Sequence, residues 1–104
     1  MAHKKDTTLL SAVTSTGAGS AIISLEYSLF SFFINASSVT SGGTVDIEAL
    51  SPAGDWVVIS TNAISADGDT IVQKEGAFSQ IRANVSARTD GTFTVSMTAR
   101  GDSH

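Results

Sequence analysis

The chain has 104 residues, a formal net charge of −4 and a charged fraction of 15%. This length corresponds to one domain, which buries roughly two-thirds of its unfolded surface. The negative charge argues against DNA, RNA or an anionic membrane surface as the main partner. The absence of cysteine excludes a disulfide and a thiolate–metal site.

The first residues form a basic, polar lead-in. We expect residues 1–6 to be a flexible N-terminal arm, followed by a single domain over residues 7–104. The lead-in has the charge of a signal peptide's start, but no clean apolar core follows it. Its basic residues His3, Lys4 and Lys5 are candidates for docking into an acidic groove of a partner protein.

Two strands are predicted next, at residues 7–16 and 21–25, with a glycine-containing turn at 17–20 between them. The most apolar stretch of the chain runs over residues 21–36. It contains Glu26 and is shorter than the roughly 20 residues that a membrane helix needs. We therefore interpret it as strand material.

A third strand is predicted over residues 29–35. Its alternation places three large apolar side chains on one face: Phe30, Phe32 and Ile34. Leu29 and Phe33 are apolar on the opposite face. Either this strand is buried on both faces, or its outer face contacts another subunit. Leu29 and Phe33 are therefore candidate partner-binding residues.

Strands at residues 44–50, 56–60 and 70–74 follow, separated by turns at 51–55 and 67–69. The first of these directs alternate apolar residues inward and two carboxylates outward, those of Asp46 and Glu48. Such a pair can in principle do acid–base chemistry or bind a cation. A solvated strand face is the favoured interpretation, with Arg82 or Arg100 as possible ion-pair partners.

The last two strands show the clearest alternation, over residues 79–86 and 92–100. One face of each is apolar: Ile81, Ala83 and Val85 on the first, and Phe93, Val95, Met97 and Ala99 on the second. A tight turn at residues 89–91 separates them. The pattern predicts an antiparallel pair with one dry and one wet face, joined by an Asp-Gly turn.

These elements together predict an all-β fold. No window shows sustained helical spacing, and short strands recur at intervals of roughly ten residues with turn signals between them. We predict an antiparallel β-sandwich, Ig-like or jelly-roll-like, of about eight short strands. A short barrel shows the same alternation and stays open as an alternative.

Few residues of the chain indicate catalytic chemistry. The only histidines, His3 and His104, lie in the end segments, so no nucleophile has an evident neighbouring base. Asp67 and Asp69 flank a glycine, but the further ligands and closing glutamate of a calcium loop are missing. We expect no catalytic residue, no metal and no cofactor. The alternative is a small metal-dependent hydrolase that uses these two aspartates with Asp90.

Trp56 stands at the start of a predicted strand. A tryptophan there more often closes one end of a sandwich core than binds a ligand. The alternative is a carbohydrate- or surface-binding module, in which Trp56, Tyr27 and exposed threonines form a shallow binding strip.

Four segments carry a resemblance to a known class of proteins. They are a Leu-Leu-x-Ala-Val-Thr strand at residues 9–14, a Gly-Gly-Thr-Val to Ser-Pro-x-Gly-x-Trp run at 42–56, Ile-Arg-Ala-Asn-Val at 81–85, and a strand after an Asp-Gly-Thr turn at 90–98. In this layout the chain resembles small bacteriophage virion β-sandwich proteins. These are of the capsid decoration, cement or head–tail accessory type.

The resemblance implies a non-enzymatic protein that decorates or cements a phage head, or serves at the neck or tail. It implies the major capsid protein or another virion protein as partner, with no nucleic acid and no membrane. Because open sandwich edges can pair between subunits, we also expect a homo-oligomer, with a trimer favoured at a threefold lattice point. The expected location is the capsid surface, after synthesis in the host cytoplasm.

Overall fold

The computed structural model describes residues 2–24 and 27–102, and their regular elements are all strands. The strands are β1 (Ala2–Val13), β2 (Gly17–Ala18), β3 (Ile22–Ile23), β4 (Leu29–Ser37), β5 (Gly43–Leu50), β6 (Trp56–Ile64), β7 (Gly68–Glu75), β8 (Gln80–Arg88) and β9 (Thr92–Asp102). In this part of the chain no helix is long and apolar enough to cross a membrane.

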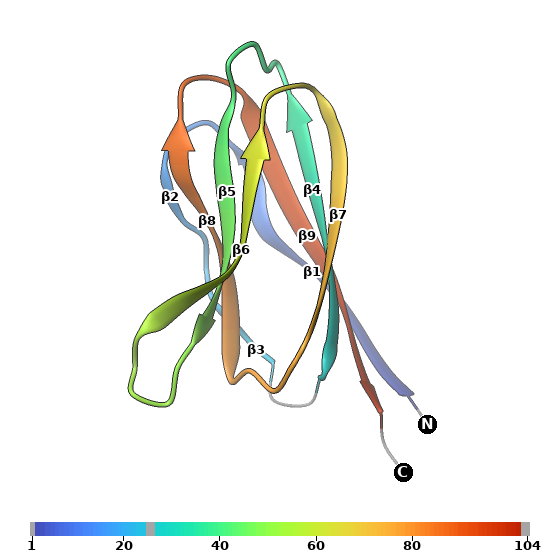
Figure 1. The fold of residues 1–104 in the computed structure, drawn as a ribbon. Coiled ribbons are helices and arrows are strands. Elements are labelled where there is room, and N and C mark those ends of the chain that lie inside the picture. The colour runs from blue at the N-terminus through green and yellow to red at the C-terminus, as the bar shows by residue number, and fades with distance from the viewer. Residues whose placement is uncertain (1, 25–26, 103–104) are drawn as a thin grey trace.

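The strands form two packed antiparallel sheets (Figure 1). Sheet A has the order β1-β9-β4-β7. Sheet B has the order β2-β8-β5-β6, and β3 also pairs with β8. If β2 and β3 count as one interrupted strand along β8, residues 2–24 and 27–102 form eight strands that pass between the sheets in the order of a jelly roll. The predicted all-β sandwich is confirmed, and of its two layouts the structure has the jelly-roll one.

The predicted pairing of the last two strands is wrong. β8 lies in sheet B and pairs with β5, whereas β9 lies in sheet A between β1 and β4. The turn at Asp90–Gly91 therefore carries the chain from one sheet to the other. An alternating strand has one apolar face whether its chain neighbour lies beside it or across the core, so the pattern does not distinguish the two cases.

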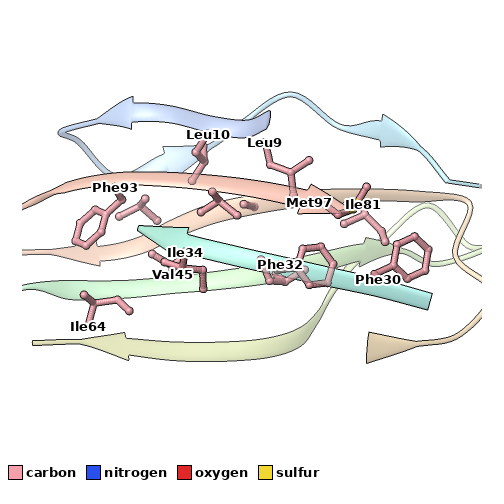
Figure 2. Packing of buried hydrophobic residues seen from close by; sticks show 14 of the residues in the cluster. Leu9, Leu10, Phe30, Phe32, Ile34, Val45, Ile64, Ile81, Phe93 and Met97 are labelled. Atoms are coloured by element: carbon pink, nitrogen blue, oxygen red, sulfur yellow. The ribbon is translucent and has the colours of Figure 1, made fainter. Parts of the chain in front are cut away.

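The hydrophobic core lies between the two sheets (Figure 2). Every side chain predicted to point inward from the third, fourth and last two strands is buried, each being 5% exposed or less. The largest fully buried side chains come from both sheets: Phe30, Phe32, Phe93, Ile34, Ile47, Ile81 and Met97. Strand alternation alone thus identified most of the core.

β1 departs from the simple alternation. Its register with β9 shifts between Thr8 and Leu10 and again between Leu10 and Val13. Because such bulges rotate the strand locally, Leu9 and Leu10 are both buried, although alternation placed them on opposite faces. A second difference lies nearby, since the segment predicted as the turn 17–20 contributes β2, which pairs with β8.

The start of the chain also differs from the flexible arm expected over residues 1–6. From Ala2 onward it forms the first half of β1 and pairs with residues 98–102 of β9. Without this pairing, one edge of β9 would leave its backbone groups without a strand partner. Thr98 also donates a hydrogen bond of 2.7 Å from Oγ1 to Oδ1 of Asp6. Figure 1 shows the two chain ends running side by side.

Candidate partner-binding surface

The outer face of sheet A presents two large apolar side chains directly opposite each other. Phe33 of β4 is paired with Ile71 of β7. Their exposed fractions are 39% and 61%, although most large apolar side chains of this protein lie in the core. Directly opposite side chains on one sheet face lie close enough to contact each other. The pair therefore forms a small exposed apolar patch, which we call the Phe33–Ile71 patch.

The same face brings several of the predicted partner-binding residues together. Leu29 lies on it, half-buried, directly opposite Arg100, and Arg100 is in turn opposite Lys4. Lys4 and Arg100 are both exposed. On β7 the residue opposite Leu29 is Glu75. These four residues therefore form one row across the sheet. The outer face of sheet A is thus acidic at this point of β7 and basic near the N-terminal end of β1.

One of the predicted residues, Lys5, is not on this face. Lys5 lies opposite Ala99, whose side chain points to the core side of the sheet, yet Lys5 itself is exposed. The side chain of His3 lies outside the described part of the structure, while its backbone is opposite Gly101. The lysine pair therefore reaches solvent from both sides of β1.

Sequence reasoning missed Ile71 as a surface residue. Ile71 and Val72 are consecutive apolar residues, so alternation did not show which of them points outward. The structure resolves this because Val72 packs against the core. A usable signal was the run of polar and charged residues around them, which is typical of an edge strand.

The outer face of sheet B carries a charged network instead of a solvated strand face. Glu48 is only 7% exposed. Arg82 donates from Nε to its Oε1 at 2.6 Å, and Asn84 donates from Nδ2 to its Oε2 at 3.3 Å. The Arg82 guanidinium also lies 4.2 Å from the ring centroid of Trp56, a cation–π distance. The predicted pairing of Arg82 with an outward carboxylate is confirmed.

Asp46 is the second outward carboxylate of β5 and is 8% exposed. Its Oδ1 atom is buried and has no hydrogen-bond partner among the described residues. Glu48, the carboxylate nearest in sequence, already has both oxygens engaged by Arg82 and Asn84. The two carboxylates therefore do not share a ligand-binding geometry.

The three aspartates of the hydrolase alternative each accept hydrogen bonds from separate partners, Asp67 and Asp90 in loops and Asp69 in β7. Asp67 accepts a hydrogen bond from the backbone N–H of Val39 at 2.8 Å, and Asp69 accepts one from Asn35 Nδ2 at 2.7 Å. Asp90 accepts from three successive backbone N–H groups, those of residues 40–42. Within residues 2–24 and 27–102 no group of three or more acidic or histidine side chains is placed to hold a metal ion.

The binding strip of the carbohydrate alternative is not assembled. Tyr27 packs against the hydrophobic core. Trp56 is half-buried on the outer face of sheet B, where Arg82 covers its ring. Trp56 is also not a core residue, so the expectation that it closes one end of the core is wrong. Its role in the structure is to stack against the arginine of the Glu48 network.

Comparisons with known proteins show the fold. No protein-family model and no curated protein sequence matches the chain. Among solved structures, the SPBc2 prophage-derived protein YomS is similar with a TM-score of 0.77 at 14% identity, over 97% of this chain and 96% of that chain. The structure of PirA is similar with a TM-score of 0.50 at 18% identity, over 93% and 92%. At these identities the likeness establishes a shared β-fold along nearly the whole chain.

Proposed function

We propose that this protein is a non-enzymatic structural component of a bacteriophage particle, bound at the capsid surface as a decoration or cement protein. The fold likeness to a prophage-derived protein, which extends over 97% of the chain, supports a phage context. The strand layout is one that viral capsid domains use.

The observation that carries the proposal is the Phe33–Ile71 patch and its charged surroundings. The patch lies on the outer face of the four-stranded sheet, away from the core. Lys4 and Arg100 lie on the same face. Apolar side chains surrounded by polar and charged ones are typical of surfaces that bind another protein. The basic end of this face suits an acidic groove in a capsid shell.

The use of the acidic side chains supports a structural role. Of the five carboxylates considered for catalysis, four accept hydrogen bonds from loop amides, from Asn35 or from the Arg82–Asn84 pair. The fifth, Asp46, is buried and separate from them. Groups held in this way stiffen the sandwich. A decoration protein requires a rigid domain with one face that binds the capsid.

The proposal is tested by imaging purified phage particles whose copy of this protein carries a small electron-dense label. We expect label at regular positions over the head. Label at the neck or tail would support an accessory role in the particle and contradict decoration of the head. Particles that lack the label, from cells that produce the protein, would overturn the proposal altogether.

A second test uses purified capsids and two matched variants. Phe33→Ser removes the larger side chain of the patch and is expected to weaken capsid binding at least tenfold. Val57→Ser removes an apolar side chain that is 50% exposed on β6 of the other sheet, and we expect no loss of binding. Equal binding by both variants would exclude the outer face of sheet A as the contact.

A further inference from the structure

β7 is the most regular free edge of the sandwich. It is the last strand of sheet A and pairs with β4 over eight consecutive residues without a register shift. The other edges are interrupted: β1 has two register shifts, β6 has one, and β2 and β3 have two residues each. Proteins commonly protect edge strands with bulges, short lengths or charged side chains. β7 has no bulge and is eight residues long, and its charged residues Asp69, Lys74 and Glu75 lie toward its two ends. Among residues 2–24 and 27–102 no strand pairs with its outer side.

The structure shows which backbone groups of β7 point to this free side. Gly76 donates a backbone hydrogen bond of 3.0 Å to the carbonyl of Ser28, in the register that continues through the β4–β7 pair. Hydrogen-bonded and non-hydrogen-bonded pairs alternate along an antiparallel ladder. Counting from Gly76, the N–H and C=O groups of Asp69, Ile71 and Gln73 therefore point away from β4.

We propose that two copies of this chain pair through β7, antiparallel, around a twofold axis at Ile71. In this register the free backbone groups of Ile71 bond to those of the partner's Ile71. Asp69 lies opposite the partner's Gln73, and Gln73 lies opposite the partner's Asp69. The outward-pointing backbone groups of Asp69, Ile71 and Gln73 therefore all form hydrogen bonds across the interface. On the opposite face, Lys74 lies opposite the partner's Gly68. Between residues 68 and 74 no like charges are opposed. Glu75 comes opposite the partner's Asp67, which lies in the turn before β7 and accepts a hydrogen bond from the N–H of Val39.

The neighbouring twofold registers are less favourable. An axis at Val72 places Asp69 opposite the partner's Glu75, and like charges directly opposite each other destabilise a strand pair. An axis at Gln73 places Ile71 opposite the partner's Glu75, so the exposed isoleucine gains no apolar neighbour. Of these three registers, only the one centred on Ile71 joins the two exposed isoleucines and opposes no carboxylates within the strand itself.

The pairing has a structural consequence for the outer face. The two four-stranded sheets join into one sheet of eight strands, because each contributes its β7 edge. Phe33 and Ile71 of one copy then continue into Ile71 and Phe33 of the other as a single apolar row. A twofold dimer, instead of a trimer, is thus the basic assembly. This inference does not depend on the proposed role in a phage particle.

The oligomeric state of the full chain tests the proposal. Sedimentation of the wild-type protein should show a dimer whose population rises with concentration. Ile71→Lys opposes two lysines across the axis and should weaken dimerisation at least tenfold. Its fold should persist because the side chain is 61% exposed, and circular dichroism checks this. The control Val58→Lys alters a side chain that is 46% exposed on β6 and should dimerise like the wild type.

The register is tested by cross-linking, for which the cysteine-free sequence is well suited. In the proposed dimer, the Cα atoms of the two Ile71 residues are separated by about 5.5 Å. Those of the two Gln73 residues are separated by about 14 Å, because they are offset by four residues along the strands as well as across the strand pair. A short bifunctional thiol reagent should therefore cross-link the variant Ile71→Cys and leave Gln73→Cys uncross-linked.

Three results would overturn the proposal. They are a wild-type protein that stays monomeric at all concentrations, an Ile71→Lys variant that dimerises as strongly as the wild type, and cross-linking of Gln73→Cys in preference to Ile71→Cys.

Discussion

The backbone N–H of Gly42 donates a hydrogen bond of 2.8 Å to Oδ1 of Asp90, and this contact joins two corners of the sandwich. Asp90 also accepts from the N–H groups of Thr40 and Ser41 at 3.0 and 3.1 Å. In the reverse direction, Thr89 donates its N–H to the carbonyl of Gly42 at 2.8 Å. The crossing from β8 to β9 is thereby fixed to the crossing from β4 to β5.

We expect Asp90→Ala to lower the melting temperature at neutral pH by several degrees, because three loop amides lose their acceptor. The backbone hydrogen bonds from Thr40, Gly42 and Ser41 lower the pKa of Asp90 below its ordinary value of 3.8. A lowered pKa contributes stability that is present above the unfolded value and is lost as the pH falls through the folded one. The difference in melting temperature between the wild type and Asp90→Ala should therefore shrink below about pH 3.8.

The control for this prediction is Asp55→Ala, which removes an exposed carboxylate from the turn between β5 and β6. It changes the net charge equally and should leave the melting temperature nearly unchanged. Thermal unfolding of all three proteins from pH 7 to pH 2 makes the comparison. If the difference in melting temperature between the wild type and Asp90→Ala stays constant down to pH 2, the Asp90 carboxylate does not stabilise the loop in its charged form.

Gly42 also has a steric role at the same corner. Its φ is +87°, and a Cβ atom there would overlap the carbonyl oxygen of Ile64. Gly42→Ala should cost about 3 kcal/mol of unfolding free energy or more, from backbone strain and displaced neighbours. Gly54 has a similar φ of +92° but open space around it, so Gly54→Ala should cost only about 1 kcal/mol. Denaturant unfolding of both variants measures the difference, and equal losses would show that the steric overlap is relieved cheaply.

The Glu48–Arg82 pair should contribute to stability because its carboxylate is buried. Arg82→Met leaves the Glu48 carboxylate without its cationic partner and should destabilise the protein by about 3 kcal/mol. The double variant Arg82→Met with Glu48→Leu should recover much of this loss, because the unpaired buried charge is removed as well. A double variant less stable than Arg82→Met would contradict this account.

The exposed pair Lys4–Asp6 provides the comparison for the buried one. Its nitrogen and oxygen are separated by 3.5 Å and both side chains are about two-thirds exposed. Ion pairs of this kind contribute little to stability. Lys4→Ala should therefore leave the unfolding transition unchanged, measured under the same denaturant conditions as the Arg82 variants.

The basic end of β1 should matter for binding more than for folding. The combined change Lys4→Glu and Lys5→Glu should weaken binding to purified capsids at least tenfold at low salt, because it reverses the charge facing an acidic groove. Added salt should reduce this difference, since exposed charges are screened. Co-sedimentation with capsids at two salt concentrations measures both effects. Unaltered binding at low salt would exclude these lysines from the contact.

The sequence predicts those features of this structure that depend on a few neighbouring residues, and not those that depend on contacts between distant parts of the chain. Alternation is a local property of a strand, so it correctly placed Phe32, Ile47 and Val95 in the core and Phe33 outside it. It also placed Glu48 on an outer face. It did not show that this carboxylate is buried, because the covering side chain of Arg82 comes from 34 residues further along the chain.

The candidate surface was predictable only in part. Phe33 was found because it is a large apolar side chain on the polar face of a clear alternation. Ile71 was missed because its neighbour Val72 is also apolar, so alternation did not show which of the two side chains points outward. The two meet because β4 and β7 are paired, and that pairing joins residues that are 38 positions apart.

The sequence by itself determined the all-β class, most strand positions and most of the inward-facing side chains, because each of these follows from a period of two residues in a short window. Only the tertiary structure decided which strands are neighbours. β8 and β9 are consecutive and similarly patterned, yet they face each other across the core instead of pairing. The physical reason is that backbone pairing and burial of the apolar faces are satisfied over the whole jelly roll at once, and no local window contains that information.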